Sequence, residues 1–162
     1  MRHSFAFGVL AVVFSSTACT ETADPPAGSY ELVFPSTAAA VATDVMQVDV
    51  YPAKSQHACQ DLFAMRQSGQ ALPKPTYSSG AVAMCDALRG TGRGRIEIEF
   101  GLAAFLAIGA RGGKDFLIGC EVQFVGEESP LPRVHLTLAD VGKPVPPTSC
   151  TRLSQYCSKE CE

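Results

Sequence analysis

Apolar and polar residues alternate with a period of two through most of the chain beyond residue 29, and this pattern constrains the fold most. The clearest example is 96–100, where Ile96, Ile98 and Phe100 are separated by two glutamates. Such alternation places one face of a strand on a core and the other in water. The alternating or short apolar segments are 30–34, 46–50, 81–84, 96–100, 103–110, 116–124 and 134–138. About seven short strands predict a mainly β domain, which we expect to be an antiparallel β-sandwich.

Turn and helix signals divide these segments. Two glycines within 111–115 separate two predicted strands and favour a hairpin turn. Apolar side chains at helical spacing over 57–68 predict one short helix, with Ser55 as its cap and Gly69 as its end. The prolines within 143–147 cannot donate ladder hydrogen bonds and are expected to end the sheet.

The N-terminus has the order of a secretory signal peptide. Arg2 precedes the segment 5–14, in which every residue is apolar or Gly. A helix of this length spans about 15 Å, half of a hydrocarbon core of about 30 Å, so it is too short for a membrane span. We therefore predict that residues 1–18 are a leader that is removed.

The end of this leader, Ala18-Cys19, resembles the lipobox of bacterial lipoproteins, in which a small residue precedes a cysteine. Ser16 stands where that motif usually has Leu, and an ordinary signal peptidase could also cut after Ala18. The resemblance implies that Cys19 bears lipid, and Thr20 in place of Asp implies sorting to the outer membrane. Residues 19–29 are then an anchor and flexible tether, and 30–162 a single domain.

Seven cysteines in so short a chain indicate an oxidising compartment. Removing Cys19 leaves an even set that can form three disulfides: Cys59, Cys85, Cys120, Cys150, Cys157 and Cys161. No Cys-x-x-Cys knuckle occurs, so no metal site is predicted. Six cysteines allow fifteen pairings. We favour Cys59 with Cys85 and Cys120 with a cysteine of the tail, which would tie down a segment that otherwise frays.

Catalytic candidates are sparse. His57 starts the predicted helix, and His135 alternates with apolar neighbours and should face solvent. A Ser-His-acid triad needs a histidine held in a positioned site. The sequence contains no Gly-x-Ser-x-Gly motif that would supply the serine of such a triad. Glu97 and Glu99 lie roughly 6–7 Å apart on one strand face, as on any solvated strand. We therefore predict no catalytic residue, no cofactor and no metal, and do not expect an enzyme.

One loop is a candidate for binding an anion. The glycine-rich stretch 90–94 is flanked or interrupted by Arg89, Arg93 and Arg95, which would suit an anionic glycan or a lipid headgroup. A phosphate-binding loop leads into a helix, whereas a strand is predicted here, so an exposed loop is the favoured interpretation. A net charge of −3 gives no case for nucleic acid, and the absence of Trp lowers the case for sugar stacking.

The lipobox-like segment, the tether, the strands and the run Phe116-Leu-Ile-Gly-Cys120 together resemble uncharacterised outer-membrane lipoproteins of bacteria. That resemblance implies an immunoglobulin-like or transthyretin-like sandwich at the cell envelope, attached to the membrane through its lipid. The favoured function is a non-enzymatic module for binding, adhesion or assembly, with a protein or glycan partner. The alternatives are an envelope enzyme or inhibitor-like module with a loop-built site, a periplasmic carrier of a small hydrophobic ligand, and a secreted or soluble periplasmic location.

Overall fold

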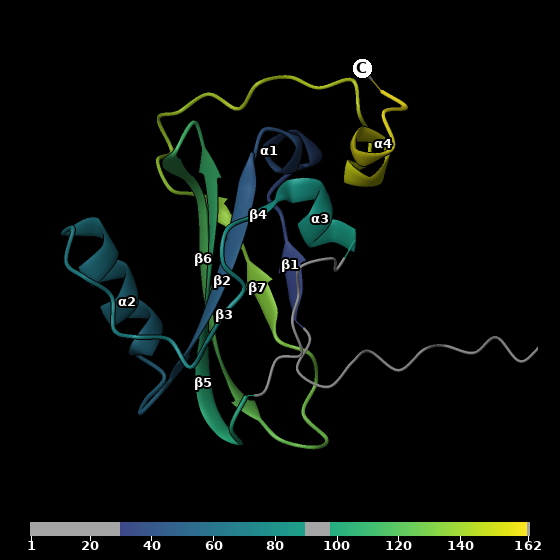
Figure 1. Cartoon of the computed structure of the whole chain (residues 1–162). Helices are drawn as coiled ribbons and strands as arrows, with labels where there is room; N and C mark the ends of the chain where they lie inside the picture. The colour runs from purple at the N-terminus through teal and green to yellow at the C-terminus, as the bar shows by residue number, and fades with distance from the viewer. Residues whose placement is uncertain (1–29, 90–97, 162) are drawn as a thin grey trace, which may run out of the picture.

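An antiparallel sheet of six strands forms the centre of the protein (Figure 1), as a computed structural model of residues 30–89 and 98–161 shows. Its strand order is β3-β2-β5-β6-β8, with β4 also paired to β2, and a second sheet consists of the parallel pair β1 and β7. The mainly β fold with an antiparallel sheet is confirmed. The strands are β1 (Glu31–Val33), β2 (Val45–Pro52), β3 (Tyr77–Ser78), β4 (Val82–Ala83), β5 (Gly101–Arg111), β6 (Lys114–Val125), β7 (Arg133–His135) and β8 (Thr137–Leu138).

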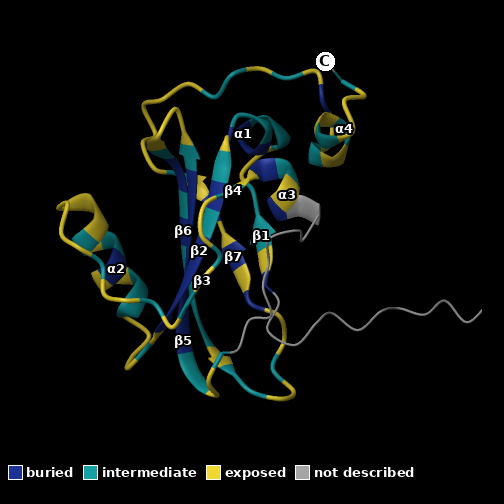
Figure 2. Ribbon diagram, viewed as in Figure 1, coloured by how far each residue is buried: buried dark blue, intermediate teal, exposed yellow. Residues whose placement is uncertain are grey.

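Strand β5 lies at the middle of the sheet and is buried on both faces (Figure 2). Every residue from 103 to 109 is buried. Phe105 and its neighbours of the same parity pack toward β1 and β7, whereas Leu106 and Ile108 pack toward the helix α2 (Ala58–Gln67). A strand buried on both faces carries a continuous apolar run, which explains why the segment 103–110 shows little alternation.

The β5–β6 hairpin forms as predicted, with Gly112 and Gly113 at positive φ in its turn. A register shift in the ladder between Gly109 and Ala110 leaves Phe116 as an extra residue. As a result Phe116 and Leu117 both belong to the core beneath β7.

Strand β7 crosses β6 at very short range. A Cβ atom on Gly119 would lie 2.3 Å from the carbonyl oxygen of His135, which is closer than real Cβ atoms approach. Only glycine therefore fits at this position.

Three predicted strands differ from the structure. Of 81–84 only Val82–Ala83 is a strand, because the helix α3 (Met84–Arg89) begins at Met84. Residues 98–100 are not a strand, and 96–97 lie outside the described residues. The first residue of β5 is Gly101, whose φ of 139° is a backbone conformation that side-chain-bearing residues rarely adopt. Ile98 packs on the core while Phe100 is exposed, so the two do not share a face.

The segment 134–138 is divided between the two sheets. Residues up to His135 form β7 and pair with β1, whereas Thr137–Leu138 forms β8 and pairs with β6. Leu136 lies between them, and its N–H donates to the carbonyl of Val33 at 2.8 Å. A single alternating segment thus contributes strands to two sheets. The chain passes from one sheet to the other while its apolar and polar residues continue to alternate.

Four helices flank the sheet in the described part of the chain, where the sequence predicted one. The predicted helix is α2, and Gly69 follows it at a φ of 70°, as expected. The predicted cap is wrong, because the N-cap is His57 and Ser55 only accepts a hydrogen bond from the His57 N–H. The helices that were missed are α1 (Thr37–Val41), α3 (Met84–Arg89) and α4 (Leu153–Cys157). They have five or six residues each, too few for a helical period to be recognised.

Helix α2 is fixed to the sheet at both ends. Near its start Cys59 is bonded to Cys120 of β6. Near its end the Arg66 guanidinium donates two hydrogen bonds of 2.8 Å to Asp115, and these hold the pKa of that carboxyl below its usual value. Between the two ties Leu62 is buried against the sheet.

The predicted pairing of Cys59 with Cys85 is therefore wrong, as is that of Cys120 with the tail. Cys85 is on α3, which lies on the opposite side of the sheet from α2 (Figure 1). Its partner is Cys157 of α4, and the third disulfide joins Cys150 to Cys161. The sheet separates the two cysteines that are close in sequence.

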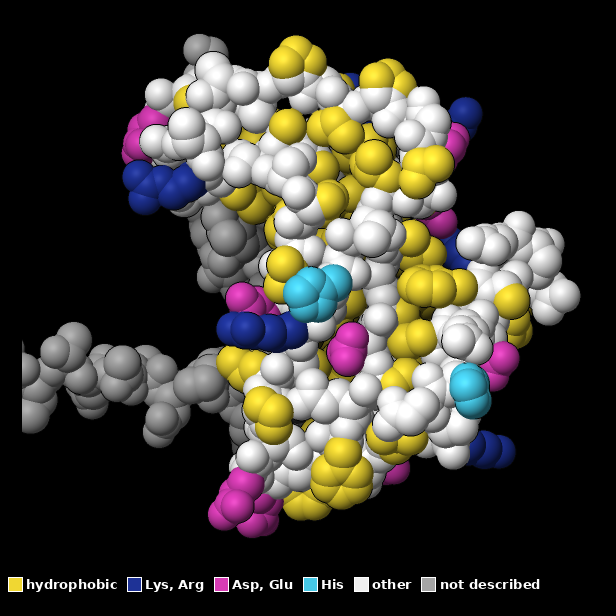
Figure 3. All heavy atoms as spheres, turned by 180° about the vertical axis from the view of Figure 1, so that it is seen from behind, with side chains coloured by type: hydrophobic (Ala, Val, Ile, Leu, Met, Phe, Trp, Pro, Cys, Tyr) yellow, Lys and Arg dark blue, Asp and Glu magenta, His cyan; other side chains and the backbone are white. Residues whose placement is uncertain are grey.

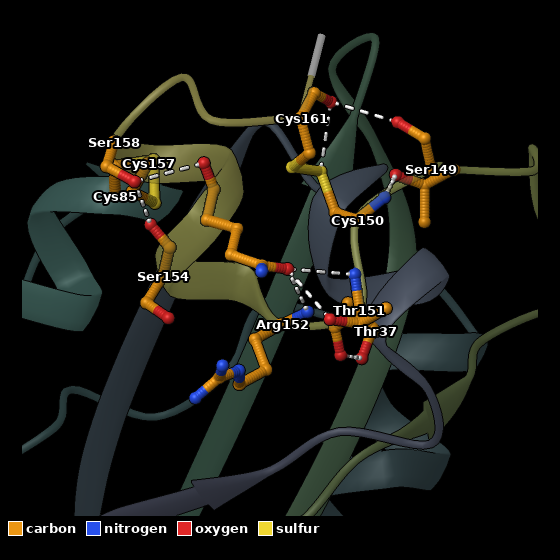
Figure 4. Close-up of a disulfide and its surroundings, with 12 residues drawn as sticks. Thr37, Cys85, Ser149, Cys150, Thr151, Arg152, Ser154, Cys157, Ser158 and Cys161 are labelled. Carbon is orange, nitrogen blue, oxygen red and sulfur yellow. Dashed lines mark hydrogen bonds between the residues drawn. A yellow bond between two sulfur atoms is a disulfide. The ribbon is translucent and has the colours of Figure 1, made fainter.

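Disulfides do tie down the C-terminal tail, as expected (Figure 4). Cys150 and Cys161 close a short loop, and Ser149 Oγ, just before this loop, donates to the carbonyl of Cys161 at 3.1 Å. Thr37 Oγ1 on α1 donates to the Thr151 carbonyl at 3.1 Å. The tail is thus held to both α1 and α3.

The length of each closed loop predicts how much each disulfide contributes. Replacing Cys59 and Cys120 together by Ala opens a 61-residue separation and should lower the free energy of unfolding by about 4 kcal/mol. The same change at Cys150 and Cys161, separated by 11 residues, should cost about 3 kcal/mol. Urea unfolding measures both, and a non-reduced digest that linked Cys59 to Cys85 would contradict the pairing.

Candidate functional site

Most of one edge of the large sheet has no neighbouring strand among the described residues. Strand β8 pairs with β6 only at Leu117 and Ile118, whereas β6 continues to Val125. Over Gly119–Val125, which we call the free edge, β6 pairs with β5 on one side and with no described strand on the other. The free edge is therefore a row of backbone groups open to a partner.

The register shows which backbone groups of the free edge point outward. Successive residues of an antiparallel strand direct their N–H and C=O alternately to one neighbour and the other. The Ala53 N–H donates to the Leu102 carbonyl at 2.8 Å, so Leu102 bonds away from β6. Its partner in the register is Phe124, whose backbone groups therefore point outward, as do those of Val122 and Cys120.

Side chains of two kinds flank the free edge. Toward α2, Cys120 and Val122 are half-buried in an apolar cluster, whereas Phe124 is 62% exposed and borders the turn at Gly126. On the other face a hollow of about 520 Å³ is lined by Glu31, Glu121, Gln123, Pro130, Leu131, Arg133 and His135. Figure 3, the view from behind, shows a histidine next to a basic side chain, with an acidic side chain nearby and hydrophobic groups around them.

The charged groups of the hollow are mostly open to solvent. Arg133 Nε donates to Glu31 Oε2 at 2.7 Å, and Gln123 Nε2 donates to the Pro130 carbonyl at 2.5 Å. Glu121 is half-buried, and its carboxylate is in no hydrogen bond or ion pair with the residues that the structure describes. The lining combines carboxylates, an arginine, a histidine and an amide with the apolar groups of Pro130 and Leu131.

Exposed aromatic side chains lie at the C-terminal end of the free edge. Phe100 is 69% exposed and lines a surface depression with Phe124, Glu127 and Glu128. Leu131 is also exposed, where it borders the hollow. Large apolar side chains grouped beside an unpaired strand are typical of a surface that a partner covers.

A buried polar cluster lies beneath α2, away from the free edge. The Asp49 carboxylate is buried and accepts hydrogen bonds from Gln47 Nε2 and from Ser78 Oγ. Burial raises the pKa of the Tyr51 phenol to about 12, assisted by the charge and hydrogen bond of Asp49. Since both carboxylate oxygens already have protein donors, this cluster has the character of a structural network.

The structure places the predicted site residues apart from one another. His57 and His135 are both exposed, the latter as expected, and only His135 borders the hollow. Arg89 ends α3, with its side chain outside the described set. Cys19, Glu97, Arg93 and Arg95 all lie outside the described residues.

The free edge was missed, although the sequence carries a signal for it. The predicted strand 116–124 is nearly twice as long as the strand 134–138 that follows it. A strand of that length cannot be paired along its whole edge by the shorter one. The division of 134–138 between two sheets increases the mismatch.

Two other features, a membrane-spanning helix and a metal site, are absent from the described residues. None of their helices has the length and apolar character needed to cross a membrane. Nor do they contain a group of three His, Cys, Asp or Glu side chains that could hold a metal ion.

The position of Tyr51 predicts a pH dependence. The folded protein keeps the phenol protonated to about pH 12, whereas an exposed tyrosine loses its proton near 10. The stability contributed by neutral Tyr51 is therefore present below pH 10 and lost as the pH rises to 12. Absorbance at 295 nm after rapid pH jumps should show a late step that Tyr51→Phe removes; an unchanged titration in that variant would contradict the assignment.

Comparison of the chain with protein-family models, with curated proteins and with solved structures found no match.

Proposed function

We propose that this chain is a lipid-anchored, non-enzymatic protein of the bacterial cell envelope that binds an extended segment of a partner protein. The observation that carries the binding role is the free edge of β6. Three disulfides support an oxidising compartment, and the leader with Ala18-Cys19 supports an anchor in the outer membrane. A secreted or soluble periplasmic form is the alternative location.

Natural sheets usually protect an edge of this kind. Lysine, proline, a bulge or a covering loop makes a strand edge unsuitable for pairing. Over Gly119–Val125 there is no Lys, no Pro and no register shift, and Glu121 is the one charged side chain. Addition of a strand to such an edge gives affinity through main-chain hydrogen bonds and specificity through the alternating side chains. The free edge has both elements, with an apolar face and a polar face.

The tether begins beside this binding surface. The Glu31 N–H donates to the Pro132 carbonyl at 2.8 Å, and the Glu31 side chain lines the hollow. Residues 19–29 then reach at most about 40 Å when fully extended. We propose that the free edge therefore works close to the membrane, where partners in the same membrane are within reach.

We also propose that the two sheets form a β-sandwich. Its support is the β1–β7 pair, which packs on one face of the large sheet through buried Val134 and Leu136. On the other face the sheet is covered by α2. An immunoglobulin-like or transthyretin-like identity stays a prediction from the resemblance of the sequence.

The anchor is tested by metabolic labelling. Wild-type protein expressed with its leader in a bacterium should incorporate labelled palmitate, and Cys19→Ser should lose the label while remaining exported. Membrane fractionation should then release the variant into the soluble fraction. An unlabelled wild-type protein would rule out lipidation, and the protein would then be soluble.

The binding role is tested by photo-crosslinking in cells. Benzoylphenylalanine in place of Phe124 should crosslink to one defined protein, whereas the same probe in place of Val141, which is 91% exposed in the loop after β8, should not. The Phe124 adduct should disappear with Val122→Pro, because that change removes an outward N–H from the free edge. An adduct that survived Val122→Pro, or none at either position, would contradict strand addition.

A further inference from the structure

We propose that the strand added at the free edge is the same strand of a second copy, so that two β6 strands pair antiparallel about a twofold axis at Val122. This inference rests on the proposed function and deepens it by naming the partner. The two large sheets would join into one continuous sheet across the axis. The interface is isologous, since each copy presents the same residues to the other.

The backbone groups of the free edge limit the registers that a second copy can adopt. Only residues with outward backbone groups form the hydrogen-bonded pairs of such a ladder, which limits them to Cys120, Val122 and Phe124. With Val122 opposite the partner's Val122, Cys120 lies opposite the partner's Phe124. Gly119 then lies opposite the partner's Val125, so that the whole free edge pairs with itself and no residue is left over.

The two ends of the free edge prevent the strands from sliding. At one end β8 pairs with β6 at Ile118 and blocks further addition. At the other end the chain leaves β6 in a turn, in which the Ser129 N–H donates to the Gly126 carbonyl at 3.2 Å. In the twofold arrangement the turn of one copy meets β8 of the other. A longer overlap is therefore obstructed, and a shorter one leaves backbone groups unpaired.

The side chains of the polar face favour the same register. With Val122 on the axis, Glu121 lies opposite the partner's Gln123, and this pair occurs twice. A slip by two residues would bring Glu121 opposite the partner's Glu121, and like charges directly across a ladder are unfavourable. A slip in the other direction pairs Gln123 with itself and shortens the overlap. The amide and carboxylate can instead hydrogen-bond across the strands.

The apolar face gains the most from pairing. Phe124 is 62% exposed in the single chain, which is unusual for a phenylalanine on a strand. Opposite the partner's Cys120, its ring covers the disulfide that joins that residue to the partner's Cys59, and sulfur makes favourable contacts with aromatic rings. The twofold axis provides two such contacts, so both exposed rings are removed from water together.

The oligomeric state of the mature chain with Cys19→Ser, which keeps it soluble, provides the first test. Sedimentation velocity should show a dimer that Val122→Pro converts to a monomer. The N–H removed at position 122 points away from β5, so the ladder within each copy is retained, and proline is tolerated on such an edge. Urea unfolding of the monomeric variant should confirm that it is folded. A wild-type chain that stays monomeric at about 100 μM would overturn the proposal.

A charge exchange tests the register without proline. Gln123→Glu puts a carboxylate opposite the partner's Glu121 at both pairs and should raise the dimer Kd about tenfold at low salt. Adding Glu121→Lys to that variant should restore the wild-type Kd, because Lys then faces Glu at both pairs. Both variants lose the Gln123 bond to Pro130, so they are matched. Equal weakening in the two variants would overturn this register.

Failure of the dimer and failure of the proposed function give different results. If the crosslink from position 124 in cells joins two copies of this chain, both hold. If it joins this chain to another protein only, and is lost with Val122→Pro, strand addition stands and the dimer is overturned. If no crosslink forms from position 124, both are overturned.

Discussion

The burial of β5 on both faces is the constraint on which the rest of the structure depends. Its side chains belong to two cores, with Phe105 in one and Leu106 in the other. Neither face can be left to water, so each needs a cover from elsewhere in the chain. The β1–β7 pair with α1 and α3 covers one face, and α2 covers the other (Figure 1). Disulfides then join α2 to β6 on one side and α3 to α4 on the other.

This two-sided arrangement explains which features the sequence predicts. Strands β2, β5 and β6, the hairpin between the last two, and the helix α2 follow from local patterns that the tertiary structure leaves unchanged. Cysteine pairing does not follow, since Cys59 and Cys85 are near in sequence but lie on opposite sides of the sheet. The two cysteines lie apart because elements of the chain cover both faces of the large sheet. The alternating pattern had predicted strands with one face in water.

The candidate site was harder to predict because it consists of backbone. Candidates such as Arg93, Arg95 and the histidines are recognised by the chemistry of their side chains. An unpaired strand edge is not marked by any particular residue type. What exposes the edge is the departure of the chain at Leu136 from one sheet to the other, which leaves only Thr137–Leu138 to pair with β6. Alternation is the same before and after that point, so a period cannot reveal which sheet a segment joins.

The route by which the chain enters the fold has a mechanical consequence. Strand β1 is the first described strand and runs toward the pole where the C-terminus lies (Figure 1). A pull on the chain from its N-terminal side would therefore act along β1, and the bonds between β1 and β7, such as that from Leu136 N–H to Val33, would be loaded together in shear. At the far pole the crosslinks of Cys157 and Cys161 keep the tail from being drawn out. A domain held at a membrane and pulled by what it binds would keep its first strand in place under load.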